Sequence, residues 1–148
     1  MTNPLLTATD LPCFAAIQPE HVEPALDQVL AANRAELERL LAANTVYRWD
    51  NLIRPLEELD DRLHKAWSPV SHLQAVRDSE SLRAAYNACL PKLSAYHSEL
   101  GQHAGLHRAY QQIADGPEYA RLDSAQRKVI DDALRDFRLS GIALPPEQ

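Results

Sequence analysis

The chain has 148 residues, about the size of one domain, and its 45% hydrophobic and 24% charged residues exclude a fully disordered chain. Its 15 Lys and Arg against 21 Asp and Glu give a formal net charge of -6, the wrong sign for holding a phosphate backbone. We therefore expect no nucleic-acid partner. The longest apolar runs are only a few residues and the mean hydropathy is -0.38, so we also expect no membrane span.

Residues 1–18 are predicted to form an extended arm on the surface of a helical body. Pro4 and Pro12 oppose helix formation, whereas scattered apolar residues can anchor the arm. The segment has neither a basic start nor an apolar core typical of a secretory signal, so we expect a cytoplasmic protein. Cys13 and Cys89 lie far apart in the sequence, and both are interpreted as small buried apolar groups without a disulfide.

The remaining sequence predicts an all-α protein. Four glycines are too few for many hairpins, and no strand-length stretch alternates apolar and polar residues. We expect an irregular antiparallel bundle of about five to seven helices over residues 19–141, followed by a linker over residues 142–148. The first helix spans residues 19–44, and Pro24 either marks its true start or kinks its first turns.

The next helices are delimited by prolines and caps. A helix over residues 49–68 is predicted to stop before Pro69, and a short helical segment follows to residue 78. Ser79 is a candidate N-cap for a helix that ends at Gly101, with a bend expected at Pro91.

Three further helical segments complete the prediction. The first has an apolar stripe from Leu106 to Ile113 and ends at the turn Asp115-Gly116-Pro117, and a brief segment over residues 119–122 comes next. In the last helix, Asp123 or Ser124 with Gln126 forms the N-terminal cap and Gly141 supplies the stop.

The most noticeable candidate site is the histidine pair His103 and His107. Two histidines four residues apart on a helix can share one zinc ion. In the H-E-x-x-H pattern of zinc proteases, however, a Glu follows the first His, and Ala104 occupies that position here. Gly105 also weakens the helix, and the third ligand is missing. We therefore interpret the pair as a surface or packing feature.

The other polar residues suggest no active site. His21, His64, His72 and His97 have no nucleophile at a recognisable spacing. The acidic pairs Asp60-Asp61 and Asp131-Asp132 diverge around a helix and are interpreted as solvated faces. No phosphate-binding loop or nucleophile elbow is present. The prediction is a helical domain with no catalytic, cofactor-binding or metal-binding residue of its own.

Several irregular strings nevertheless resemble a known family. LPCFAAIQPEHVEPALDQVL (residues 11–30), YRWDNLIRPLEELDDRLHKAWSPVSHL (47–73), GQHAGLHRAY (101–110) and ALRDFRLSGIALP (133–145) occur in the order found in the N-terminal region of zinc metallopeptidases of the thimet oligopeptidase family. The resemblance covers essentially the whole chain. It is specific, because helical periodicity alone does not reproduce such strings.

The resemblance implies the fold and function of a larger protein. Members are mostly helical and cleave short peptides in a channel between two lobes. Their H-E-x-x-H helix and glutamate ligand for zinc would lie beyond residue 148, so we expect no cofactor in this segment and zinc only in the parent enzyme. The segment would shape one lobe and the substrate channel, with the rest of the enzyme as its partner and short peptides as the parent's substrates. By itself it would be inactive.

A second hypothesis remains open at this point, which is a free-standing helical module that binds a protein partner and has no enzymatic activity. Under the peptidase hypothesis, the face that contacts the rest of the enzyme is left exposed in the isolated chain. We then expect self-association through that face as an artefact.

Overall fold

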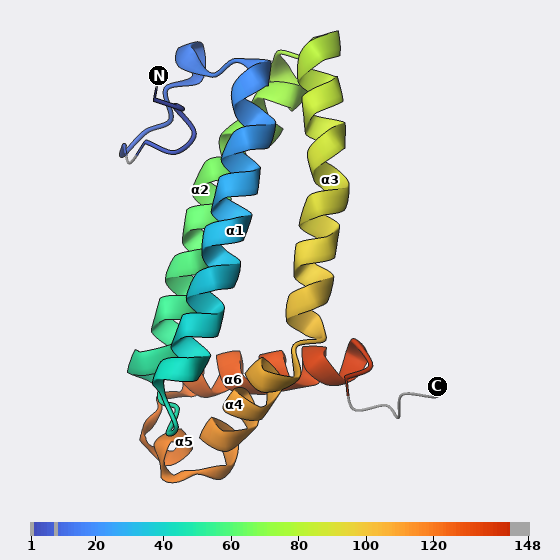
Figure 1. Cartoon of the computed structure of the whole chain (residues 1–148). Helices are drawn as coiled ribbons and strands as arrows, with labels where there is room; N and C mark the ends of the chain where they lie inside the picture. Colours follow the sequence, from blue (N-terminus) through green and yellow to red (C-terminus); the bar gives the residue numbers. More distant parts are fainter. Residues whose placement is uncertain (1, 8, 143–148) are drawn as a thin grey trace. The chain divides into compact units, whose positions relative to one another are not determined.

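The computed structural model describes residues 2–7 and 9–142, and they are all-α as predicted (Figure 1). Within these residues there are six α-helices, two short helical turns and no strand. The last six residues of the predicted linker, 143–148, lie outside the described part. The helices are α1 (Pro19–Ala43), α2 (Arg54–Val76), α3 (Glu80–Gly101), α4 (Ala104–Asp115), α5 (Pro117–Arg121) and α6 (Ser124–Leu139).

The chain separates into two compact units. The first contains Met1–Glu36 and Glu57–Ser94, and the second contains Leu37–Leu56 and Ala95–Gln148. Helices α1, α2 and α3 each contribute residues to both units. No described helix is both long and apolar enough to cross a bilayer.

In the first unit, the portions of α1, α2 and α3 form a bundle in which successive helices run in opposite directions (Figure 1). Helix α1 begins at Pro19 and contains Pro24 in its interior, so Pro24 does not mark the start of the helix. The amide of Asn33, a fully buried residue, donates a hydrogen bond of 3.1 Å to the Leu59 carbonyl and so links α1 to α2. The buried apolar residues of these helices include Val22, Leu26, Val29, Leu59, Leu63, Val70 and Leu82.

The predicted stop before Pro69 is wrong, because α2 continues through this residue to Val76. Proline cannot donate to the carbonyl four residues earlier, and its ring crowds that carbonyl. Pro69 is nevertheless buried, as are Ala66, Val70 and Leu73 on the same helix. Burial of this apolar face offsets the lost hydrogen bond, so tertiary packing overrides the local signal. The helix also starts later than predicted, since Trp49–Ile53 forms a π-helical turn before it.

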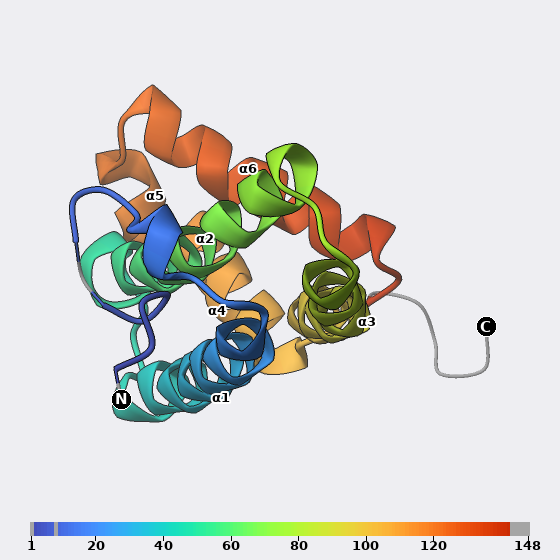
Figure 2. The same cartoon turned by 90° about the horizontal axis from the view of Figure 1, so that it is seen from above.

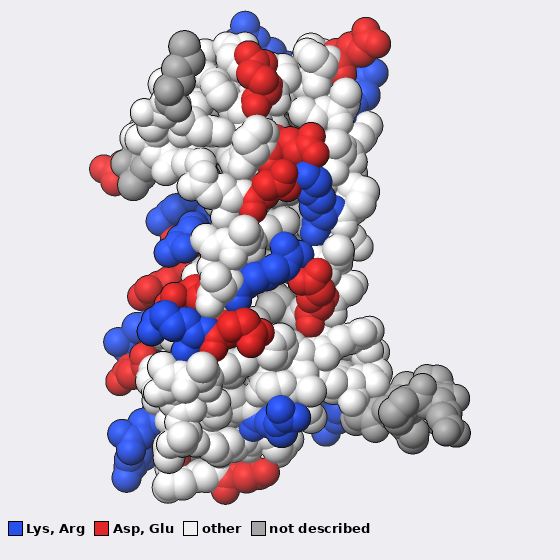
Figure 3. Space-filling view, viewed as in Figure 1, with Lys and Arg blue, Asp and Glu red and all other residues white. Residues whose placement is uncertain are grey.

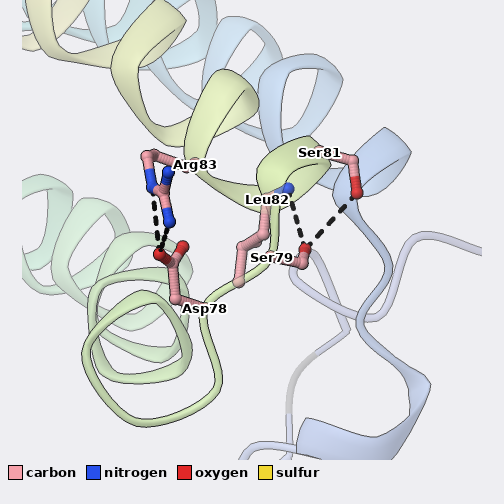
Figure 4. A network of polar contacts seen from close by, with 5 residues as sticks. All are labelled: Asp78, Ser79, Ser81, Leu82 and Arg83. Carbon is pink, nitrogen blue, oxygen red and sulfur yellow. Dashed lines mark hydrogen bonds and ion pairs between the residues drawn. The ribbon is translucent and has the colours of Figure 1, made fainter.

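The predicted N-cap of α3 is confirmed (Figure 4). The Ser79 hydroxyl accepts a hydrogen bond of 3.1 Å from the backbone N–H of Leu82. Asp78, just before the cap, forms an ion pair with Arg83. One orphan donor of the helix N-terminus is thereby satisfied, and the chain is fixed where it turns from α2 into α3.

The second unit has its own apolar core. Its central cluster of buried residues is Leu40, Trp49, Leu52, Ile53, Ala109, Ile113, Leu122 and Ile130. Gln112 of α4 fixes the connection after α1, because its side chain accepts from Tyr47 N at 2.6 Å and donates to the Thr45 carbonyl at 3.1 Å. The predicted start of the last helix is confirmed, since Asp123 and Gln126 form a reciprocal capping box. Gly141 follows the helix with a φ of 84°, the left-handed conformation that favours glycine.

Candidate functional site

His103 acts as a helix cap in this structure. It precedes α4, and its Nδ1 accepts a hydrogen bond of 3.1 Å from the backbone N–H of Leu106. Its Nε2 lies 2.7 Å from Oε1 of Glu38. Because Nδ1 is an acceptor, Nε2 must carry the ring proton and donate it to Glu38. Both nitrogens of His103 are therefore engaged in hydrogen bonds within the chain.

His107 has a different environment from His103, although the two residues are one helical turn apart. Its ring packs against Phe137 of α6, with 5.2 Å between the ring centroids. Gly105 lies between the two histidines, and a Cβ there would be 3.2 Å from Cε1 of His103. The sequence suggested only that Gly105 weakens the helix. In the structure its missing side chain also leaves room for the capping ring.

Each of the remaining histidines either contacts another residue of the chain or lies at the surface. Nδ1 of His21 accepts from Gln18 N at 3.0 Å, and the His72 ring lies 5.3 Å from that of Phe14. His97 contacts Tyr96, and His64 is exposed. In the described part of the chain, no group of three or more His, Cys, Asp and Glu residues is arranged to hold a metal ion.

The paired acids lie on solvated helix faces, as the sequence predicted. Asp61 forms an ion pair of 2.7 Å with Lys65. Asp131 accepts from the hydroxyl of Tyr119, and this hydrogen bond raises the pKa of the tyrosine. A hydrogen bond from Lys128 lowers the pKa of Asp132. Each of these acids thus has a partner or faces water, and none is paired with its neighbour.

A charged cluster that the sequence did not reveal connects α1 to α3. The ammonium group of Lys92 lies 2.7 Å from a carboxylate oxygen of Glu23 and 2.7 Å from one of Asp27. These hydrogen bonds raise the pKa of Lys92 above its ordinary value. The residues are 65 or more positions apart, so no local spacing could have indicated the cluster.

The two cysteines differ, and neither is in a disulfide. Cys89 is fully buried as predicted, and burial, followed by the nearby charge of Glu23, raises its pKa to about 11. Its thiol is therefore protonated and unreactive at neutral pH. The prediction for Cys13 is wrong, because this residue is exposed. Cys13 lies in the part of the arm between the buried residues Leu5 and Ile17.

A cavity of the first unit lies between the arm, α1 and α2, and has a volume of about 780 Å³. Figures 1 and 2 both show the arm beside these two helices. The apolar lining of the cavity includes Phe14 of the arm, Val29 of α1 and Pro69 of α2. Its charged lining comes mainly from α2 and consists of Asp10, Glu58, Asp61, Arg62 and Lys65. The volume is within the usual range of small-molecule pockets.

The charges on the molecular face shown in Figure 3 are mixed. Lys and Arg side chains are interspersed with Asp and Glu there, and no broad area carries a single sign. That face therefore has no continuous basic surface of the kind that binds a phosphate backbone.

Comparisons with known proteins identify the family. The family described as "Neurolysin/Thimet oligopeptidase, N-terminal domain" matches residues 26–148. The chain belongs to this family. The assignment agrees with the resemblance seen in the irregular sequence strings and with the all-α fold.

Relatives in the thimet oligopeptidase family match the chain over its whole length. Oligopeptidase A of Salmonella typhimurium is 53% identical over 148 residues, and that of Escherichia coli is 52% identical over 148 residues. Both matches cover 100% of this chain and 22% of the relative. The probable cytosolic oligopeptidase A of Arabidopsis thaliana is 34% identical over 147 residues, which is 99% of this chain and 21% of the relative. The chain thus spans about a fifth of the length of these curated relatives.

Proposed function

We propose that this chain is the N-terminal helical domain of a zinc-dependent oligopeptidase that hydrolyses short peptides in the cytoplasm. The observation that carries the proposal is the 53% identity to an oligopeptidase A over all 148 residues. Similarity at this level extends through the arm and every helix, so it concerns the whole domain rather than one motif.

The role of this segment in the proposed enzyme is to shape one lobe and the substrate channel. His103 caps a helix and His107 packs on Phe137, so the histidine pair that most resembles a zinc site has structural contacts. The described residues do not fit zinc, and the metal would be held by residues outside the 148. When bound there, zinc would polarise the scissile carbonyl and lower the pKa of a water molecule. Selection of short peptides would then come from channel geometry.

The proposal is tested by comparing two chains. One is the 148-residue chain, and the other is the longer reading frame that contains it. We expect the longer chain to retain zinc and to cleave a short fluorogenic peptide, with loss of activity after chelation and recovery when zinc is restored. The 148-residue chain is expected to bind no stoichiometric zinc and to leave the peptide intact. Zinc-dependent turnover by the short chain would contradict the assignment of the catalytic centre.

A second measurement tests peptide-length selection. The longer chain should cleave the short peptide but spare the same sequence placed within a loop of a folded protein. Cleavage of both substrates at similar rates would contradict a channel that restricts access. If the reading frame ends at residue 148 and no peptidase activity copurifies, the alternative of a free-standing interaction module is supported instead.

A further inference from the structure

The N-terminal arm is a loop whose two ends meet at the same residue of α1. The side-chain amide of Asn3 donates to the His21 carbonyl at 2.8 Å, and the backbone N–H of Gln18 donates to His21 Nδ1 at 3.0 Å. Leu5 and Ile17, near the two ends, are buried, whereas residues 9–16 are exposed. Compact surface loops with adjacent ends are frequently functional. Here the exposed part of the loop forms one wall of the cavity described above.

The cavity combines an apolar surface with charges of both signs. Phe14 is 39% exposed and packs its ring against His72, so it offers an aromatic face to an apolar side chain. Asp61 and Lys65 neutralise each other. Glu58 and Arg62, both exposed, also line the cavity, and neither is in an ion pair with another described residue. Beside the Asp61–Lys65 pair, the cavity therefore presents one base, Arg62, and two acids, Asp10 and Glu58, to a ligand.

The backbone separation of Glu58 and Arg62 on α2 is comparable with the length of a short peptide. Glu58 and Arg62 are four residues apart on α2, which places their backbones about 6 Å apart along the helix axis. A dipeptide or tripeptide in extended form places its amino and carboxyl groups about 6 to 10 Å apart. Such a peptide is a zwitterion, and its charges complement a carboxylate and a guanidinium group. An apolar side chain on the peptide would complement the aromatic wall.

We propose that this cavity is a binding site for short peptides that have free termini and an apolar side chain. Glu58 would contact the amino terminus, Arg62 the carboxylate, and Phe14 the side chain. The inference rests on the proposed function only in that such peptides are the substrates or products of an oligopeptidase. The site itself lies entirely within the first unit and contains none of the catalytic machinery.

The proposal is tested by titrating the isotope-labelled 148-residue chain with the tripeptide Ala-Phe-Ala and recording its amide NMR signals. We expect saturable shifts of residues that line the cavity at millimolar peptide concentrations. The same tripeptide with an acetylated amino terminus and an amidated carboxyl terminus should bind about three- to tenfold more weakly, since two exposed ion pairs are lost. Equal binding of the two peptides, or shifts confined to other regions, would overturn the proposal.

Matched variants test the proposed contacts of Arg62 and Phe14 separately. Arg62→Gln should bind the free and the C-amidated peptide equally, whereas Phe14→Ser should weaken both. Arg77→Gln, directly after the end of α2 and outside the cavity, and Leu11→Ser, on the same arm, should behave like the unmodified chain. If Arg62→Gln retained full discrimination for the free carboxylate, the assigned contact would be wrong.

Failure of this proposal can be distinguished from failure of the proposed function. Hydrolysis of the fluorogenic peptide by the longer chain tests the peptidase assignment and does not depend on this cavity. The longer chain should also show the tripeptide shifts when its zinc is removed. If the longer chain hydrolyses peptides but the cavity residues do not respond to the tripeptide, only the binding site is refuted.

Discussion

His103 illustrates how the contacts of a single residue change its interpretation. In the sequence it is half of a potential zinc-binding pair, but in the structure its ring accepts from the first turn of α4. Glu38 accepts a hydrogen bond from Nε2 on the opposite edge of the ring, and it belongs to α1 and is distant in the sequence. Gly105 leaves space for this arrangement. The three residues together explain the composition of the segment without a metal.

Substitution of His103 tests the capping role. His103→Ala should lower the free energy of unfolding by about 1 kcal/mol, because the Leu106 N–H loses its acceptor. His103→Asn keeps a capping oxygen and should retain most of that stability, since the lost contact with the exposed Glu38 contributes little. Urea unfolding followed by circular dichroism provides the measurement. If the alanine variant is as stable as the asparagine variant, the ring does not stabilise α4.

The buried thiol of Cys89 predicts a pH dependence of stability. Its pKa is about 11 in the folded chain, whereas an unfolded cysteine titrates near about 8.5. Above about pH 8.5 the unfolded chain therefore binds fewer protons than the folded chain, and the free energy of unfolding falls as pH rises toward 11. The loss from this group should reach about 3 kcal/mol.

Cysteine variants isolate that contribution. Cys89→Ala should reduce the decline in stability between about pH 8.5 and 11, whereas Cys13→Ala should leave it unchanged because Cys13 is exposed. Lysine titration is common to both variants and cancels in the comparison. Identical pH slopes for Cys89→Ala and Cys13→Ala would show that the buried thiol does not titrate as described.

At the scale of the helices, the interior prolines are the main departure from local propensity. Helices α1, α2 and α3 each contain one, at Pro24, Pro69 and Pro91. Pro69 is buried and packs in the first unit, whereas Pro24 and Pro91 are exposed. Each proline removes one backbone hydrogen bond. Only at Pro69 does burial of the ring itself offset the loss.

This difference predicts unequal effects of alanine substitution. Pro91→Ala should raise the free energy of unfolding by about 1 to 3 kcal/mol, because a helix donor is restored and no buried contact is removed. Pro69→Ala restores a donor as well but loses buried apolar area, so its gain should be smaller by about 1 kcal/mol or more. Thermal unfolding of the two variants decides the order. A larger gain for Pro69→Ala would mean that its ring contributes no packing energy.

At the scale of the whole molecule, the proposed function predicts a surface that the rest of the proposed enzyme covers. Large exposed apolar side chains of the described residues include Leu11, Val46, Val76 and Leu139. Isolated exposed apolar residues are normal, whereas contiguous ones mark interfaces. We expect exposed apolar side chains of this kind to contribute to that surface and to promote self-association of the isolated chain.

Sedimentation velocity tests this expectation. The 148-residue chain should self-associate as its concentration rises to about 100 μM, a typical range for weak apolar contacts. The longer chain should remain monomeric under the same conditions because the face is covered. A strictly monomeric short chain would contradict the exposed docking face, although the family assignment would stand.

The sequence by itself determined the fold class, the family and most helix boundaries. Caps such as Ser79 and Asp123 act within one helical turn, so their roles follow from local spacing. The irregular strings that indicate the family are likewise read directly from the order of residues along the chain. The paired acids were interpreted correctly for the same reason, because their divergence around a helix is local geometry.

Only the tertiary structure decided the features that depend on distant segments. The continuation of α2 through Pro69 requires burial against other helices, and the ion pairs of Lys92 join residues separated by more than 60 positions. The interpretation of His103 depends on its contact with Glu38 of α1. The peptide-sized cavity depends on an arm that folds back to His21. Local spacing cannot reveal these contacts, since folding brings their partners together through space rather than along the chain.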